Sequence, residues 1–262
     1  MRALRTVVCC SFVLGLLACS AQVPTQSQDQ PDGEGSTDQG IGHGSSVPHF
    51  RTRVIRVLPH DRSSFTQGLE LVDGTLYEGT GTYGGSALRA TDPNTGRVHR
   101  EARLPAALFG EGITVVSDRI WQLTWQEGIA IQRDRGSLAE VSRVRYSGEG
   151  WGLCHDGERL IASDGSERLT FRDPRTFDEI GEVRVTIDGS PVEEINELEC
   201  VDGAVWANIW HSDEIVRIDP ATGRVTAVVD ASGLLPPRER ARADVLNGIA
   251  AVPGTDEYLL TG

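Results

Sequence analysis

The chain has 262 residues, of which 39% are hydrophobic, and it carries a formal net charge of −13 at pH 7. This acidic balance argues against nucleic acid or an anionic membrane surface as partners, because like charges repel. The length that remains after a polar N-terminal region corresponds to one domain.

Residues 1–19 have the composition of a bacterial lipoprotein signal peptide. Arg2 and Arg5 lie around the start of the chain, an apolar run extends from Thr6 to Leu17, and Leu16–Cys19 matches a lipobox. The apolar run is too short for a permanent transmembrane helix. We therefore expect cleavage before Cys19, lipidation of its sulfur, and attachment to the bacterial cell envelope on the periplasmic or surface side. The alternative is an ordinary secretory signal with incidental cysteines.

Residues 20–49 are predicted to be a disordered tether. They consist mainly of Ser, Gln, Gly, Asp, Pro and Thr, with almost no large apolar side chain. Such a segment cannot bury enough apolar surface to offset the entropy lost on ordering. We expect it to hold a folded domain of residues 50–262 away from the membrane, which the chain would contact only through its lipid anchor.

Five stretches of this domain repeat at a spacing of 40 to 51 residues. They begin at Gln67, Glu111, Trp151, Asn196 and Asn247, and the next residue is glycine in four of them. A turn and an apolar strand follow in each case. A period of about 45 residues with strand-like content is typical of a β-propeller. We predict an all-β, five-bladed propeller in which these five side chains meet at the central axis.

Two hairpin signals recur within the repeats. Asp-Gly turns such as Asp73–Gly74 join the first and second strands, and Asp-Pro turns such as Asp92–Pro93 join the third and fourth. Each blade should therefore be a four-stranded antiparallel sheet. Val54–Leu58 is expected to supply the outer strand of the last blade and close the ring. Because Leu259–Gly262 falls on the second strand of that blade, its third strand is expected to be missing.

The folded part contains two cysteines, Cys154 and Cys200, on the inner strands of consecutive repeats. They could form a disulfide in an oxidising compartment, and two buried free thiols are the alternative.

No motif requires a cofactor or a metal. Gly79–Gly84 matches the glycine pattern of dinucleotide sites, but a strand and a turn follow it instead of the helix that such a site needs. No Cys or His spacing resembles a zinc site.

Glu111 is the only one of the five repeat-start residues that can carry a proton. Glycines on both sides of it allow close approach of backbone and ligand. Desolvation among tryptophan and asparagine side chains would disfavour its charged form and suit it to proton transfer. The alternative is a structural carboxylate that accepts hydrogen bonds from backbone amides.

Three tryptophans, Trp125, Trp151 and Trp210, fall at the ends of predicted inner strands or in adjacent loops. They could form the walls of a small-ligand pocket, or they could pack between blades. Gln67 and Asn196 are neutral hydrogen-bonding groups that could hold an amine or an amide, or could satisfy strand ends.

Several segments of the chain resemble, in order and at similar spacing, the plant and bacterial type of glutamine cyclotransferase. They are Phe65–Leu69, Phe109–Thr114, Leu123–Trp125, Gly148–Leu153, Ile195–Glu199 and Trp206–Trp210. The resemblance extends from about Pro59 to Gly262, nearly the whole folded part. It implies a five-bladed propeller, in agreement with the repeats, and it implies a different fold from the zinc-dependent animal type.

The resemblance also implies an activity, namely cyclisation of N-terminal glutaminyl residues of peptides and proteins to pyroglutamate with release of ammonia. Glu111 matches the family's acid/base glutamate, and Phe65 matches an aromatic residue that supports the pocket. The substrate pocket itself is matched at Gln67, Trp125, Trp151, Asn196 and Trp210. The family's lysine, which follows a Thr-Gly pair in the last blade, would come after Gly262.

Two other functions stay open on the sequence. One is a non-catalytic propeller that displays a binding surface on a lipid anchor. The other is a metal-dependent propeller lactonase or hydrolase with glutamate and asparagine ligands, which would need a second carboxylate beside Glu111. We expect peptide or protein substrates, no nucleic acid partner, and a monomer.

Overall fold

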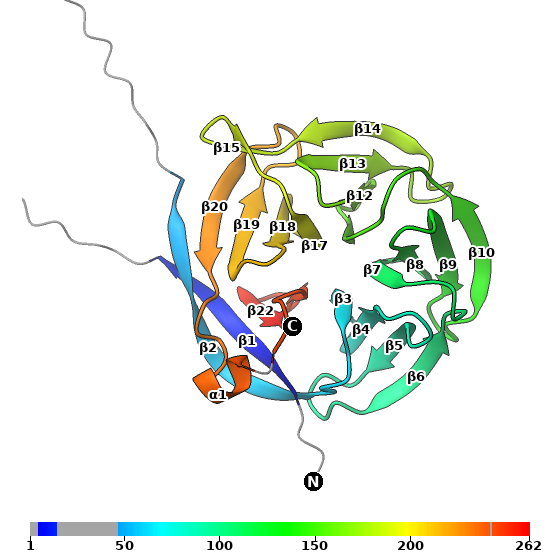
Figure 1. Ribbon diagram of the computed structural model, residues 1–262, viewed down its shortest axis with the longest axis horizontal. Helices are drawn as coiled ribbons and strands as arrows, with labels where there is room; N and C mark the ends of the chain where they lie inside the picture. The colour runs from blue at the N-terminus through cyan, green and yellow to red at the C-terminus, as the bar shows by residue number, and fades with distance from the viewer. Residues whose placement is uncertain (1–4, 15–46, 242) are drawn as a thin grey trace, which may run out of the picture.

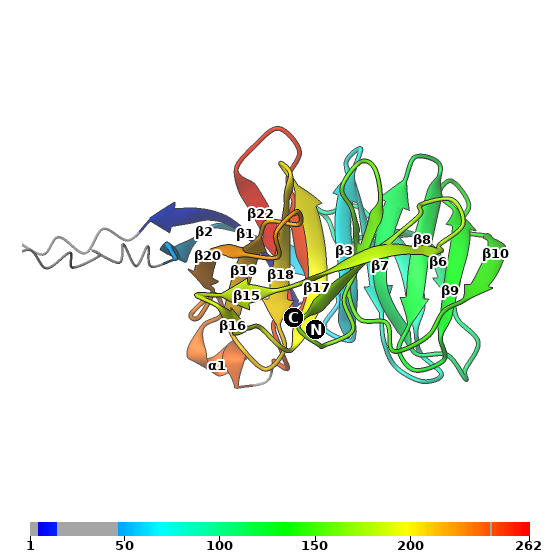
Figure 2. The ribbon, with the colours of Figure 1, turned by 90° about the horizontal axis from the view of Figure 1, so that it is seen from above.

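The computed structural model describes residues 5–14, 47–241 and 243–262. As predicted, the chain is almost entirely β-structure arranged like a propeller around a central axis (Figure 1). Figure 2 shows the same body from the side, with the strands running across its thickness. The single helix of the described residues, α1, covers only Pro237–Arg240, and none of them forms a helix that could cross a membrane.

Three antiparallel sheets of four strands follow one another around the axis. The first contains β3 (Thr66–Val72), β4 (Thr75–Thr80), β5 (Ala87–Thr91) and β6 (Val98–Arg103). The second contains β7 (Gly110–Val116), β8 (Arg119–Thr124), β9 (Ile129–Asp134) and β10 (Glu140–Arg145). The third contains β11 (Leu153–His155), β12 (Leu160–Ala162), β13 (Arg168–Arg172) and β14 (Glu179–Arg184). The small hairpin of β15 (Thr186–Ile187) and β16 (Ser190–Pro191) follows.

The remaining strands form one eight-stranded sheet. Its first half is β17 (Ile195–Val201), β18 (Ala204–Ile209), β19 (Glu214–Ile218) and β20 (Val225–Asp230). Its second half, from the outside inward, is β2 (His49–His60), β1 (Arg5–Leu14), β22 (Glu257–Leu260) and β21 (Ile249–Ala251). The halves meet where residues His49–Arg51 of β2 pair in parallel with Val228–Asp230 of β20.

The strand β1 differs from the sequence-based expectation for the N-terminal region. We expected β2 to lie beside a blade that lacks its third strand, but β1 occupies that position and pairs with β2 along its whole length and with β22 at Val8–Ser11. Without β1, the facing edges of β2 and β22 would have unpaired N–H and C=O groups, and such edges readily pair with a further strand. Cys19 and residues 20–46 of the expected tether lie outside the described residues.

The innermost strands approach one another closely at the glycines that follow the repeat-start residues. A Cβ atom on Gly68 would lie 2.5 Å from the Ile113 nitrogen, and one on Gly112 would lie 2.6 Å from the Trp151 carbonyl oxygen. The Gly112 N–H also donates to that Trp151 oxygen at 2.7 Å. Glycine is therefore needed here for close approach of backbone to backbone.

Glu197 stands where the other four repeats have this glycine, and its side chain bridges strands instead. Its Oε1 accepts a hydrogen bond from the Leu69 N–H at 3.1 Å, and its Oε2 accepts one from the Ile249 N–H at 2.8 Å. The carboxyl thus joins β17 to β3 and β21. Burial raises the pKa of Glu197 to about 8, although the two N–H donors act in the opposite direction.

The disulfide left open by the sequence is formed between Cys154 on β11 and Cys200 on β17. Their Cα atoms lie 5.4 Å apart, and the bond closes a loop of 46 residues. It joins the innermost strands of the third sheet and the eight-stranded sheet, close to the point where Glu197 acts.

Apolar side chains fill the space between neighbouring sheets. Trp121 and Trp206, the two tryptophans in the middle of predicted strands, are both buried. The indole N–H of Trp121 donates to the Pro174 carbonyl oxygen at 2.9 Å, and its ring packs on Phe177 with 4.9 Å between centroids. These two tryptophans therefore belong to the core.

The first prediction concerns the disulfide. Replacing both cysteines (Cys154→Ala with Cys200→Ala) should lower the free energy of unfolding by about 2 to 4 kcal/mol, because the unfolded chain regains the freedom of the closed loop. Urea denaturation measures this change, and the unmodified protein should approach the same stability in a strong reductant. An unchanged midpoint in both experiments would contradict the prediction.

The second prediction concerns Glu197. A carboxyl with a raised pKa binds its proton more tightly in the folded than in the unfolded state, so its contribution to stability falls as pH rises toward 8. One pKa unit corresponds to about 1.4 kcal/mol, and we expect Glu197 by itself to lower the free energy of unfolding by about 2 kcal/mol between pH 6 and pH 8.

Glu197→Gln should lose only the contribution of Glu197, because the buried carboxyls Glu70, Glu111 and Glu199 also have raised pKa values and keep their share of the pH dependence. The exposed neighbour Glu193 provides a matched control, and Glu193→Gln should keep the full dependence. Denaturant titrations at pH 6 and pH 8 measure the free energy of unfolding. The same decrease between the two pH values in all three proteins would rule out the assignment to Glu197.

Candidate active site

The sequence-predicted site residues all lie at one end of the strands. The start of each innermost strand pairs with the end of the second strand, as in Thr66 with Thr80 and Gly110 with Thr124. Each predicted residue lies at or just before the start of an innermost strand, or just after the end of a second strand. They are Phe65, Gln67, Glu111, Trp125, Trp151, Asn196 and Trp210. The fold therefore brings them to one face of the molecule.

Glu111 lies near the start of β7 and is 95% buried, with only 5% of its surface exposed. Burial raises its pKa well above the ordinary value for glutamate, and the charges of Glu149 and Glu127 add to this effect. Within the described residues its carboxyl oxygens have no hydrogen-bond partner. The group thus holds a proton tightly, and no hydrogen bond to the described residues fixes its carboxyl, in contrast to the structural carboxylate Glu197.

A continuous series of aromatic rings forms one wall beside Glu111. Phe109 contacts Phe65 edge-on with 6.4 Å between ring centroids, and it contacts Trp125 at 5.6 Å. Tyr83 packs on the outer side of Phe109 at 5.3 Å. The sequence analysis singled out Phe65 and Trp125, whereas Phe109 and Tyr83 were not identified as wall residues.

A second aromatic pair comes from more distant parts of the chain. Trp151, before β11, meets Trp210, after β18, edge-on with 5.3 Å between their centroids. Trp210 is 36% exposed, so this pair reaches from the interior to the surface. One carboxylate, Glu149, joins the two walls, because it accepts hydrogen bonds from the indole N–H groups of both Trp125 and Trp151.

Amide side chains form the third part of the site. The Asn247 Nδ2 donates to the Gln67 Oε1 at 2.5 Å and to the Thr66 carbonyl oxygen at 3.2 Å. The Oδ1 atoms of Asn196 and Asn247 are buried without a hydrogen-bond partner among the described residues. A buried acceptor without a donor is costly, so both atoms are suited to receive N–H groups of a ligand. The sequence pattern predicts for Asn247 only a position at the central channel.

The arrangement can bind a small polar group and transfer a proton. Aromatic walls hold an aliphatic chain, the two amide oxygens accept from an amine or a carboxamide, and Glu111 can exchange a proton with a group beside it. Among the described residues, no three His, Cys, Asp or Glu side chains are grouped as metal ligands.

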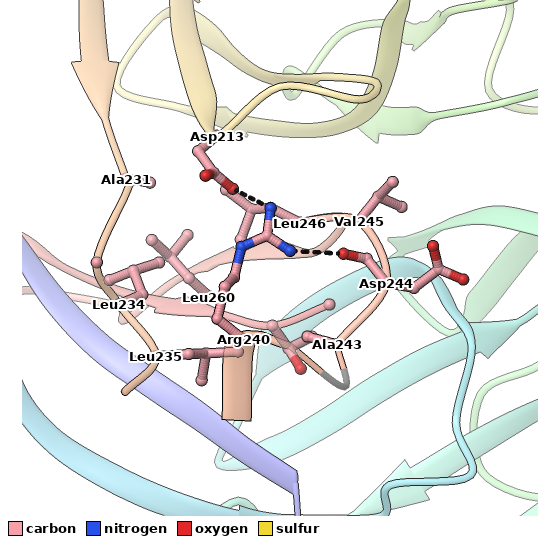
Figure 3. A pocket seen from close by; sticks show the side chains of 13 residues that line it. Asp213, Ala231, Leu234, Leu235, Arg240, Ala243, Asp244, Val245, Leu246 and Leu260 are labelled. Carbon is pink, nitrogen blue, oxygen red and sulfur yellow. Dashed lines mark hydrogen bonds and ion pairs between the residues drawn. The ribbon is translucent and has the colours of Figure 1, made fainter. Parts of the chain in front are cut away.

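A separate hollow lies beside the C-terminal residues, and none of the predicted site residues lines it (Figure 3). Leu234, Leu246 and Leu260 give it an apolar floor. At its edge the Arg240 guanidinium donates to the Asp213 carboxylate at 3.2 Å and to the Asp244 carbonyl oxygen at 3.1 Å. The hollow is lined by none of the aromatic residues of the Glu111 site and not by Glu111 itself, so it does not share the chemistry of that site.

Comparison with known proteins identifies the family of the chain. The family model described as glutamine cyclotransferase matches residues 17–262. A glutaminyl-peptide cyclotransferase of Arabidopsis thaliana is 37% identical over 235 residues, covering 87% of this chain and 73% of the plant protein. The crystal structure of Myxococcus xanthus glutaminyl cyclase is 41% identical with a TM-score of 0.76, covering 83% of this chain and 93% of that chain. The chain therefore belongs to the glutamine cyclotransferase family.

Proposed function

We propose that the protein cyclises N-terminal glutaminyl residues of peptides and proteins to pyroglutamate and releases ammonia. The observation that carries this proposal is Glu111, a buried carboxyl with a raised pKa and no hydrogen-bond partner among the described residues, placed between aromatic walls. The relatives named above as glutaminyl cyclases support the same reaction.

The reaction is an intramolecular acyl transfer. The free α-amine attacks the carbon of the γ-carboxamide, a carbon–nitrogen bond forms, and a proton leaves the attacking nitrogen. Glu111, in its ionised form, accepts this proton and delivers it to the nitrogen of the carboxamide, which departs as ammonia when the second carbon–nitrogen bond breaks. A carboxyl with a raised pKa suits both steps, because it is a stronger base than an ordinary glutamate and can return the proton.

The other site residues would fold the substrate side chain back on itself. Trp125, Trp151 and Trp210 confine its methylene groups, and the free Oδ1 atoms of Asn196 and Asn247 accept hydrogen bonds from its amine or carboxamide. Gln67 is held by Asn247 and orients the same groups. Such positioning can supply about 7 to 11 kcal/mol in ideal intramolecular reactions.

We further propose that the strands form a five-bladed ring in which β21, β22 and β2 belong to the last blade; β1 (Arg5–Leu14) lies between β22 and β2 only in the unprocessed chain, because cleavage before Cys19 removes it. The order of these strands in the eight-stranded sheet supports this proposal. The lipobox ending at Cys19 supports attachment of the enzyme to the bacterial cell envelope through a lipid on that residue.

The third prediction tests the role of Glu111. Glu111→Gln should lower kcat for ammonia release from a Gln-initiated dipeptide by at least about 100-fold, because the amide cannot carry the proton. The unfolding midpoint should change little, since the side chain makes no hydrogen bond that the fold needs. A coupled ammonia assay measures the rate.

Glu140→Gln, in the outer strand of the same sheet, is the control and should keep full activity. Near-normal turnover by Glu111→Gln would show that the proton carrier is another group. If the unmodified protein released no ammonia, the non-catalytic propeller would be the better interpretation.

The fourth prediction concerns the anchor. Cys19→Ser removes the thiol that would carry the lipid, and we expect the protein to move from the membrane fraction to the soluble fraction while its specific activity stays the same. Fractionation of bacterial cells followed by immunoblotting measures the change. Equal membrane association of both proteins would contradict lipidation at this residue.

A further inference from the structure

Among the described residues, Glu149 is the carboxylate that accepts hydrogen bonds from both aromatic walls of the site. It lies in the loop between β10 and β11, and its Oε2 accepts the Trp125 indole N–H at 2.8 Å and the Trp151 indole N–H at 3.0 Å. Its Oε1 accepts the side-chain N–H of Gln126 at 2.9 Å. Although partial burial acts in the opposite direction, these donors hold the pKa of Glu149 below its usual value.

The loop that carries Glu149 is held in place by other bonds. The Gly150 N–H donates to the Trp125 carbonyl oxygen at 2.9 Å, and the Trp151 N–H donates to the Ser163 carbonyl oxygen at 3.0 Å. The Tyr146 hydroxyl also donates to the Thr124 carbonyl oxygen at 2.6 Å. Because backbone contacts fix the loop, truncation of the Glu149 side chain should leave the fold in place.

We propose that Glu149 is a positioning residue of this enzyme, whose carboxylate sets the orientation of the Trp125 and Trp151 indoles and so the width of the substrate pocket. This inference rests on the proposed function. The two indoles come from different sheets, and the carboxylate is the contact that they share. Hydrogen bonds to a charged acceptor are shorter and stronger than neutral ones, so a single oxygen can hold both rings.

Each indole also has a ring contact on its far side. Phe109 packs against Trp125, and Trp210 packs against Trp151. The carboxylate therefore stands at the centre of a series of four aromatic rings, with Trp125 and Phe109 on one side and Trp151 and Trp210 on the other. Without it, two buried or half-buried N–H donors would lose their acceptor, and each ring could turn within its contacts.

The same hydrogen bonds determine which indole N–H group remains available to donate to the substrate. The N–H groups of Trp125 and Trp151 are both donated to Glu149 and are not available to the substrate. The Trp210 indole N–H has no acceptor among the described residues. If a tryptophan donates to the oxygen that becomes negative during acyl transfer, the structure assigns that contact to Trp210.

The charge of Glu149 and its hydrogen bonds have separable effects. The charge helps to raise the pKa of Glu111, whereas the bonds hold the indoles. Glu149→Gln removes the charge and keeps an oxygen that can accept both N–H groups, and the exposed Gln126 can rotate its amide to match. Glu149→Ala removes the charge and the acceptor.

The experiment measures kcat and KM for a Gln-initiated dipeptide, together with tryptophan emission, in both variants. Glu149→Ala should raise KM by about tenfold or more and shift the emission, since a lost bond to a charged acceptor corresponds to about 1.5 to 3 kcal/mol. Glu149→Gln should stay within about threefold of the unmodified KM and keep its emission. The control is Glu158→Ala, because Glu158 is an exposed carboxylate in the turn between β11 and β12. This variant should change neither KM nor tryptophan emission.

Equal losses of substrate affinity in the alanine and glutamine variants would overturn the proposal, because the charge alone would then account for them. Unchanged KM and emission in Glu149→Ala, with an intact unfolding transition, would overturn it as well. The proposed function is tested separately by ammonia release from the unmodified enzyme, so failure of one is not confused with failure of the other.

Discussion

The site depends on how closely the innermost strands approach one another at their starts. Gly68 and Gly112 place backbone against backbone, where a Cβ atom would collide, and Glu197 bridges three strands through two backbone N–H groups. The side chains immediately before these positions, Gln67, Glu111 and Asn196, are brought together because their neighbours in sequence are packed. A wider spacing at the axis would move Glu111 away from Gln67 and Asn196.

Two kinds of buried carboxyl follow from this packing. Glu197 accepts hydrogen bonds from backbone N–H groups, and its position is fixed by them. Glu111 is equally removed from water but has no such donor among the described residues. Burial raises the pKa of both groups, and the surrounding donors distinguish a structural group from one that can exchange protons. Glu149 is a third case, an anion that serves to hold two indoles.

The sequence predicted the repeat, the four-stranded sheets and the end of the strands at which the site lies, because glycines and turn residues recur at a regular spacing. It did not identify Glu149, Phe109 or Tyr83 as parts of the site, since they lie in loops of unequal length whose contacts depend on the final fold. The position of β1 was also missed, because an apolar run is typical of a leader and of a strand alike. The bond between Cys154 and Cys200 stayed open because sequence does not give the distance between neighbouring strands.

The parallel contact between β2 and β20 has a mechanical consequence. Only three residues of each strand pair there, His49–Arg51 with Val228–Asp230, and β2 begins at that point. A force on the chain at Val47 directed along β2 would load these hydrogen bonds together, in shear, and would not open them one after another. The junction that completes the sheet is thus placed to resist tension from the segment that precedes it.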